Sequence, residues 1–190
     1  TGPASSDPGS LLNGSRNQDS FINQTFTVAG TYYLVVGEWD TVGADGQVTG
    51  NSPDFGDTYT LHISLDHHAA TGTGAAVLEI EPNNLPIDFS LNPTLAQNLD
   101  GSNWSLASNP KNDSSTTVPH TTVLGGGVNG QSSGDSIDVW SFTTTGTAGT
   151  VVIDIDDNTF DSEILLYTVN GVLVASSDDA TADTGNGVAG

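Results

Sequence analysis

The sequence of 190 residues contains no cysteine and only two lysine or arginine residues, Arg16 and Lys111. The absence of cysteine excludes disulfides, thiolate metal ligands and cysteine nucleophiles. The two cations stand against 23 Asp and Glu residues, which gives a formal net charge of −21. Because no basic surface can neutralise phosphates, we expect no binding to nucleic acid or to an anionic membrane surface. Cations are the expected partners of so acidic a chain.

A hydrophobic run long enough to cross a membrane is also missing. Runs such as 32–36 have the length of a strand, whereas a transmembrane helix needs roughly 20 apolar residues. No basic stretch followed by an apolar one opens the chain, so we expect any signal peptide to lie outside these residues. The sequence therefore predicts a soluble chain without membrane insertion.

What the sequence does contain is short bursts of strand-forming residues, separated by glycine, proline, threonine, serine and asparagine. Apolar and polar residues alternate within 58–65, which predicts one buried and one solvent-exposed face, with His62 on the exposed one. Asn170 and Gly171 lie between two apolar runs and predict a tight hairpin. The strands expected from these patterns are 20–28, 31–38, 58–65, 137–144, 150–156, 162–169 and 172–176.

No segment has the pattern of a long amphipathic helix, so no helical crossovers are available to connect parallel strands. The predicted fold class is therefore all-β, an antiparallel β-sandwich that is jelly-roll-like. Two segments rich in small and polar residues, 67–76 and 98–133, are predicted to be connectors. The second is long for a compact domain, and loops of that length are usually functional or mobile.

Four motifs in the second part of the chain follow one another in a characteristic order. They are EIEPNN at 79–84, GDSIDVWSF at 134–142, DSEILLY at 161–167 and NGVLVASSDD at 170–179. This string resembles the bacterial pre-peptidase C-terminal domain, a family whose relatives include clostridial collagen-binding domains. The resemblance spans most of 79–179, interrupted by the long connector, and it implies a β-sandwich.

The first 66 residues resemble the other end of such a domain. Their motifs are DSFI at 19–22, GTYYLVVG at 30–37 and GDTYTLHI at 56–63. In the family this part follows the Asp-Asp motif, whereas here it precedes the Glu-rich opening, so the order is permuted. We therefore divide the chain into C-terminal-half strands at 1–66, a linker at 67–78 and an N-terminal half at 79–190, with an insertion at about 98–133.

Two arrangements accommodate the permutation. Residues 1–66 complete the sandwich formed by 79–190 of the same chain, or they complete a preceding copy while the next copy completes this one. Strand donation between copies would cover exposed edges and build a fibre. Equally, the 190 residues could be one period of a tandem array.

The resemblance to the collagen-binding relatives also implies a calcium site. A physical reason points the same way, because converging carboxylates repel one another without a cation, and Ca²⁺ takes oxygen ligands of the kind this chain has in excess. The alternative is that the acidic residues are solvated turn formers that keep the protein soluble. The resemblance places these residues around calcium: Glu79, Glu81, Asn83, Asn84, Asp135 and Asp138. Further candidates are Asp161, Asp178 and Asp179.

Motifs for catalysis are missing from the sequence. It contains no Gly-x-Ser-x-Gly elbow, no His-Glu-x-x-His pair and no phosphate-binding loop, and no spacing places one of its four histidines beside a serine and an aspartate. We therefore do not expect an enzyme. Trp140 lies in the family's core motif and is expected to be buried, whereas Trp39 and Trp104 border loops and are expected to be more available for binding.

Taken together, these features predict a non-catalytic, extracellular, calcium-binding β-sandwich module. We expect it to act as a structural or adhesive repeat, or as a subunit of a surface protein or filament. Its expected partners are copies of itself, as a homopolymer or tandem array, and an extracellular matrix protein or polysaccharide. The alternative is an accessory domain that targets a secreted peptidase or other hydrolase to collagen or polysaccharide.

Overall fold

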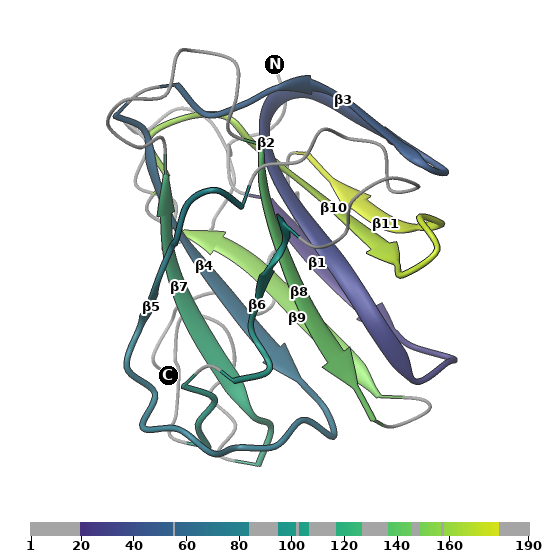
Figure 1. The fold of residues 1–190 in the computed structure, drawn as a ribbon, viewed down its shortest axis with the longest axis vertical. Coiled ribbons are helices and arrows are strands. Elements are labelled where there is room, and N and C mark those ends of the chain that lie inside the picture. Colours follow the sequence, from purple (N-terminus) through teal and green to yellow (C-terminus); the bar gives the residue numbers. More distant parts are fainter. Residues whose placement is uncertain are drawn as a thin grey trace, which may run out of the picture.

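The computed structural model describes residues 20–54, 56–83, 95–101, 103–106, 117–126, 137–145, 149–156 and 158–178. This part of the chain folds into eleven strands packed as two layers (Figure 1). The strands are β1 (Phe21–Thr25), β2 (Gly30–Ala44), β3 (Gln47–Asn51), β4 (Thr58–Leu65), β5 (Val77–Leu78), β6 (Gln97–Asn98), β7 (His120–Gly126), β8 (Asp138–Thr144), β9 (Thr150–Asp156), β10 (Ser162–Thr168) and β11 (Leu173–Ser177). No helix within these ranges is long and apolar enough to span a membrane.

Two sheets face each other and form the predicted β-sandwich. The first sheet has the order β1-β9-β4-β7-β5, and the second has the order β11-β10-β2-β8-β6, with β3 paired to β2 outside that path. Each sheet interleaves strands from before residue 66 with strands from after residue 119: β4 lies between β9 and β7, and β2 lies between β10 and β8. Strands from both ends of the sequence therefore complete one sandwich within one chain.

All seven predicted strands are present, with bounds that differ by at most a few residues apart from β2, which runs on to Ala44. The expected purely antiparallel pairing is wrong at two edges, where β5 pairs in parallel with β7 and β6 pairs in parallel with β8. At the first of these edges the reason is that β7 inserts between β4 and β5, so that the chain returning from β4 runs alongside β7 instead of β4.

The expected connector at 98–133 contains a strand that the sequence did not predict. Strand β7 pairs with β4 along its whole length, and its Val123 is fully buried in the core. Its HTTVLGG sequence lacks the apolar alternation of the other strands. Gly125 explains part of this composition, because a Cβ there would lie 2.3 Å from Cζ of Tyr59. At this position β7 therefore leaves room for the Tyr59 ring.

The main core lies between the sheets and is built from the inward-facing residues of both, including Tyr59, Leu61, Trp140 and Ile153. A second apolar cluster covers the outer face of the second sheet, where Val48 of β3 packs with Val35, Val139 and Tyr167. The hairpin of β2 and β3 thus folds back over its own sheet, as Figure 1 shows. Burial of apolar surface on both faces of this sheet stabilises the sandwich.

The outer face of the first sheet differs from the expected solvent-exposed face. His62 and Ser64 of β4 are only 4% and 1% exposed, although they lie on the face of the sheet that points away from the apolar core. The His62 ring lies with Nδ1 3.1 Å from Oγ1 of Thr122 and with Nε2 3.4 Å from Oδ2 of Asp156. Alternation therefore identified the core face correctly but not the environment of the polar face.

The three tryptophans divide differently from the prediction. Trp140 is fully buried, as predicted, and Trp39 is 60% exposed. Trp104 is fully buried, so the prediction that it is available for binding is wrong. Its indole Nε1 donates to the carbonyl oxygen of Leu99 at 2.7 Å, and its ring stacks on His68 at a centroid distance of 4.0 Å. A tryptophan beside a loop is thus buried here because both its polar and its apolar parts find partners.

Candidate metal site

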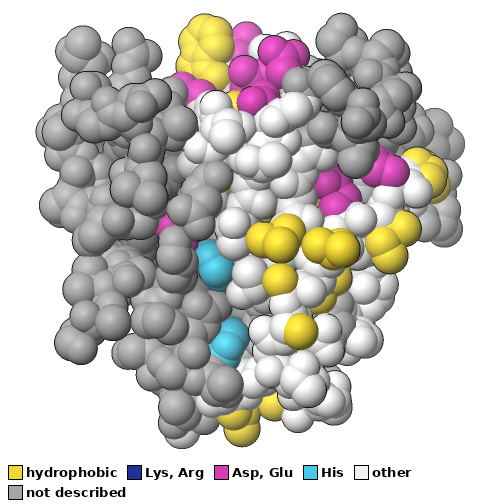
Figure 2. Space-filling view, turned by 90° about the vertical axis from the view of Figure 1, so that its left-hand side faces the viewer, with side chains coloured by type: hydrophobic (Ala, Val, Ile, Leu, Met, Phe, Trp, Pro, Cys, Tyr) yellow, Lys and Arg dark blue, Asp and Glu magenta, His cyan; other side chains and the backbone are white. Residues whose placement is uncertain are grey.

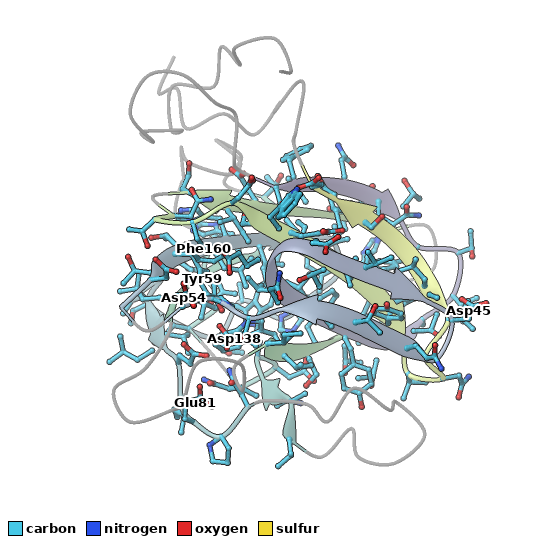
Figure 3. All side chains as sticks on the ribbon, turned by 90° about the horizontal axis from the view of Figure 1, so that it is seen from above. Asp45, Asp54, Tyr59, Glu81, Asp138 and Phe160 are labelled. Carbon is cyan, nitrogen blue, oxygen red and sulfur yellow. The ribbon has the colours of Figure 1, made fainter. Side chains whose placement is uncertain are left out.

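Three carboxylates converge at one end of the sandwich. Asp138 opens β8 in the second sheet, and Glu79 and Glu81 follow β5 at the edge of the first sheet. One ligand oxygen from each lies within 4.8 Å of the others. Figure 3 shows Glu81, Asp138 and Tyr59 toward the same end of the molecule, with Asp45 at the opposite end. We call Glu79, Glu81 and Asp138 the converging cluster.

Strand β5 directs the two glutamates toward Asp138 by its alternation. Leu78 and Ile80 are 66% and 69% exposed, whereas Glu79 and Glu81 between and beyond them are only part-exposed. Figure 2 shows apolar side chains gathered on the side of the molecule that carries β5 and β7. The backbone is held on both sides: Glu79 N donates to Leu124 O at 3.1 Å, and the Gln97 side chain bonds to both Leu78 O and Ile80 N.

Tyr59 ties the converging cluster to the core. Its hydroxyl donates to Oδ2 of Asp138 at 2.6 Å and accepts a hydrogen bond from the indole Nε1 of Trp140 at 3.2 Å. All three side chains are buried. Gly125 leaves room for the phenol ring above β7. This chain of hydrogen bonds fixes the orientation of the Asp138 carboxylate.

Asn83 lies beside the converging cluster and has a buried oxygen that pairs with none of the described residues. Its backbone N donates to Oε2 of Glu81 and its Nδ2 donates to Oε1 of Glu79, each at 2.9 Å. The residue is fully buried, and its Oδ1 accepts no hydrogen bond from the part of the chain that the structure describes. Buried polar atoms normally find partners, so an amide oxygen left over next to three carboxylates is informative. A half-turn of the amide would bring Oδ1 to the side that faces Glu79.

The electrostatics of the cluster favour a positive charge. Burial raises the pKa of Glu79, and the charge of Glu81 adds to that rise, while hydrogen bonds with Asp138, Gly126 and Asn83 act in the opposite direction. Burial and the charges of Asp138 and Glu79 also raise the pKa of Tyr59 well above its ordinary value, so its hydroxyl stays protonated as a donor. The carboxylates are therefore stabilised by protons and by hydrogen-bond donors, and a bound cation would stabilise them more strongly.

The remaining candidate ligands fall into two groups. Asp161 and Asp178 are described but lie outside the converging cluster: the backbone oxygen of Asp161 accepts from Trp39 N, and that of Asp178 accepts from the Ser20 hydroxyl. Asn84, Asp135 and Asp179 lie outside the described residues. Within the described ranges, the converging cluster is the only group of three or more metal-ligating side chains whose atoms meet this closely.

Sequence reasoning missed Tyr59, Gly125 and Gly126 as parts of the site. Gly126 N donates to Oε2 of Glu79 at 2.8 Å, and the other two place and orient the Asp138 carboxylate. The useful signal was Tyr59 at a core position, because a buried tyrosine hydroxyl needs a polar partner. Identifying that partner required knowing that β4 and β8 face each other, which no local pattern states.

A hydroxyl, an imidazole and a carboxylate do line up elsewhere, in Thr122, His62 and Asp156. They lie on three neighbouring strands, with Thr122 directly opposite His62 and Asp156 opposite Thr60, and the His62 ring is only about 5% exposed. Little of the imidazole is therefore open to a substrate, and these residues make a buried polar contact within the sheet.

Comparison of the chain with protein-family models, with curated proteins and with solved structures found no match. The resemblance to the pre-peptidase C-terminal domain thus rests on the ordered motifs alone.

Proposed function

We propose that this chain is a non-catalytic, extracellular β-sandwich module that binds Ca²⁺ and serves as a structural or adhesive unit of a larger surface assembly. The observation that carries the proposal is the meeting of Glu79, Glu81 and Asp138 within 4.8 Å beside the unpartnered Oδ1 of Asn83. Every one of these groups offers oxygen.

The donor set fits a hard cation. Ca²⁺ takes oxygen ligands from carboxylates, asparagine side chains and backbone carbonyls and tolerates irregular geometry, whereas softer transition metals favour sulfur and imidazole. The described cluster contains no histidine, and the chain contains no cysteine. Three carboxylates held by donors from Tyr59, Asn83 and Gly126 would present their remaining lone pairs to the ion.

Calcium would act here as a staple between the sheets. Asp138 belongs to the second sheet, while Glu79 and Glu81 continue an edge strand of the first. A bound ion would link them and anchor the start of the segment after β5. In a chain without disulfides, binding to the folded state alone supplies such a link, at about 2.7 kcal/mol when free calcium is 100 times the Kd.

The extracellular location is part of the proposal, and it sets the affinity expected of the site. Calcium-binding modules that work outside cells have Kd values of about 0.1 to 1 mM, which only extracellular calcium fills. A dense negative charge also keeps such a protein soluble. Folding would then be completed where calcium is abundant.

Side chains close the edges of the sandwich, which favours an array of covalently linked copies over strand donation between copies. Ser20 Oγ lies 2.6 to 3.0 Å from the carbonyl oxygens of Ser162, Ser177 and Asp178, bridging β1 and β11. At the other side, Gln97 of β6 bonds to the outer edge of β5. An added strand would have to displace these bonds. We expect light scattering after size-exclusion chromatography to show a compact monomer in calcium, and a calcium-dependent polymer would contradict this.

The calcium site is tested by urea unfolding with millimolar CaCl₂ and again with chelator. With about 10 mM CaCl₂ and a Kd of about 0.1 to 1 mM, we expect calcium to raise the free energy of unfolding of the wild type by about 1.5 to 2.5 kcal/mol. We expect Glu81→Gln and Asp138→Asn to lose most of that increment. The matched control is Asp45→Asn, which removes one charge at the opposite end of the molecule (Figure 3). Equal calcium increments in all four proteins would refute the site.

A further inference from the structure

Trp39 is the one tryptophan whose ring faces solvent, 60% exposed, while the other two are fully buried. It lies within β2, just where the pairing with β3 is interrupted between Glu38 and Val42. β-Bulges of this kind re-aim side chains, and they recur beside binding sites. A large exposed aromatic at such a position is therefore a candidate contact for a partner.

The backbone around Trp39 is fixed on both sides. Its N–H donates to Asp161 O at 2.8 Å, and its carbonyl oxygen accepts from Nδ2 of Asn51 at 3.2 Å. Thr41 is fully buried beneath the bulge, with Oγ1 2.6 Å from Glu38 O and 2.9 Å from Asn51 O. The indole is thus presented from a rigid base, which reduces the entropy lost on binding.

Glycines make this bulge possible. A Cβ at Gly37 would lie 2.5 Å from Oγ1 of Thr41, and one at Gly50 would lie 2.3 Å from Cα of Thr41. Gly50 also has φ +143°, and Asp40 next to the tryptophan has φ 72°, a region that aspartate tolerates better than most residues. Gly37, Asp40 and Gly50 therefore all fit the backbone conformation of the bulge that carries Trp39.

Acidic residues lie next to Trp39 in the chain and at the start of the neighbouring strand β10. Glu38 and Asp40 flank Trp39 in the chain, and Asp161 is bonded to its backbone. Burial raises the pKa of Glu163 to about 7, helped by the charges of Asp178, Asp40 and Asp161. Neither Arg16 nor Lys111 falls within the described ranges, so no lysine or arginine there offsets this charge.

We propose that Trp39 and the carboxylates beside it form a docking surface for arginine or lysine side chains of a partner protein. The face of an indole attracts cations, and carboxylates accept the hydrogen bonds of a guanidinium or ammonium group. A neutral sugar would also stack on tryptophan, but it would gain nothing from the concentration of negative charge. The inference rests on the proposed adhesive role, for which it names the class of partner, and it does not depend on the calcium site.

The test measures binding of a labelled, capped Gly-Arg-Gly-Arg-Gly-Arg peptide by fluorescence anisotropy, in millimolar calcium and at several salt concentrations. We expect Trp39→Leu, which keeps the apolar surface and loses the ring, to bind about 5- to 10-fold more weakly, and Trp39→Phe to lose only about 2-fold. Asp40→Asn should weaken binding more than the control Asp45→Asn. Asp45 is a suitable control because it lies away from Trp39. Its carboxylate accepts from Leu173 N, beyond the C-terminal end of β10, whereas Asp161, which accepts from Trp39 N, precedes the N-terminal end of β10.

Three results would overturn the proposal. Unchanged affinity in Trp39→Leu, or equal losses in Asp40→Asn and Asp45→Asn, would mean that the peptide responds only to the net charge of the chain. Trp39-dependent binding of a neutral β-glucan oligosaccharide in place of the peptide would assign the surface to carbohydrate. Asp138→Asn separates this proposal from the calcium site, because we expect it to lose calcium binding and to keep peptide binding at temperatures where it is folded.

Discussion

Two groups of carboxylates on this molecule are made of the same residue types but differ in how the strands hold them. In the converging cluster, Glu79, Glu81 and Asp138 bring oxygens within 4.8 Å of one another. In the second group, which we call the dispersed cluster, the carboxylates influence one another through their charges and do not meet at one point. Its members are Glu38, Asp40, Asp161, Glu163 and Asp178.

The difference lies in the supporting donors. The converging cluster receives hydrogen bonds from Tyr59, Asn83 and Gly126, which hold each carboxylate in place and lower the repulsion between them. For Glu79, these hydrogen bonds oppose the rise in pKa that burial causes. For the part-exposed Glu38 and Glu163, burial raises the pKa, and the charges of neighbouring aspartates add to that rise. Acidic residues alone therefore do not make a metal site. Hydrogen-bond donors must also hold the carboxylates so that their oxygens face one point, where a metal ion can bind them; otherwise the carboxylates relieve their repulsion by taking up protons.

The largest expected effect comes from removing the space beneath Tyr59. Gly125→Ala would place a Cβ 2.3 Å from Cζ of Tyr59 and force the ring away from Asp138. We expect a loss of about 3 kcal/mol in the free energy of unfolding together with most of the stabilisation by calcium, both measured by urea unfolding. The control is Gly101→Ala, where the added Cβ meets nothing within 4 Å. If both variants unfold alike, Gly125 has no role in building the site.

Removing only the donor should have a smaller effect. Tyr59→Phe leaves Oδ2 of Asp138 and Nε1 of Trp140 without the hydroxyl that now pairs with both. We expect a loss of about 2 kcal/mol in chelator, because buried polar groups are left unsatisfied, and a weaker affinity for calcium by isothermal titration calorimetry. Tyr32→Phe is the control, since its hydroxyl donates to Val28 O at a part-buried position away from the converging cluster. Unaltered calcium affinity in Tyr59→Phe would separate the hydroxyl from the metal site.

The sequence predicted the sandwich well because most strands carry their own signal. Strands such as β4 and β9 have apolar residues at every second position facing the core. Strand β7 has no such signal, since Gly125 and Thr121 take up inward positions that other strands fill with large side chains. The two-residue strands β5 and β6 exist only through their pairing, which no local pattern encodes.

The candidate site was predictable only in part. Glu79, Glu81 and Asp138 were grouped through a resemblance to a family, and the structure brings these three side chains together. Periodicity could not have grouped them, because Asp138 is far from the two glutamates in the sequence and belongs to the other sheet. Tyr59 and the burial of Asn83 depend on the packing of β4, β7 and β8, so they became visible only in three dimensions.

The dispersed cluster should respond to pH with the opposite sign from a stabilising ion pair. The folded-state pKa of Glu163 is raised to about 7, so its contribution to stability is present below its unfolded pKa of 4.5 and is lost as pH rises through 7. We expect Glu163→Gln to be more stable than the wild type at pH 8, by about 1 kcal/mol after allowing for the solvent that screens this part-exposed group. At pH 4 the two proteins should have nearly the same free energy of unfolding, and a difference that does not change with pH would contradict this explanation.

The smallest expected effect distinguishes the two clusters most directly. Asp178 was a candidate calcium ligand; its backbone oxygen accepts a hydrogen bond from Ser20, and its charge raises the pKa of Glu163. Asp178→Asn keeps the backbone acceptor and removes one like charge, so we expect the calcium increment of the wild type to persist within about 0.5 kcal/mol. Stability in chelator should stay equal or rise slightly, because repulsion with Glu163 is relieved. If the calcium increment instead falls as far as it does in Asp138→Asn, the dispersed cluster also holds an ion. A close meeting of three described side chains would then be too strict a criterion for a calcium site in this protein.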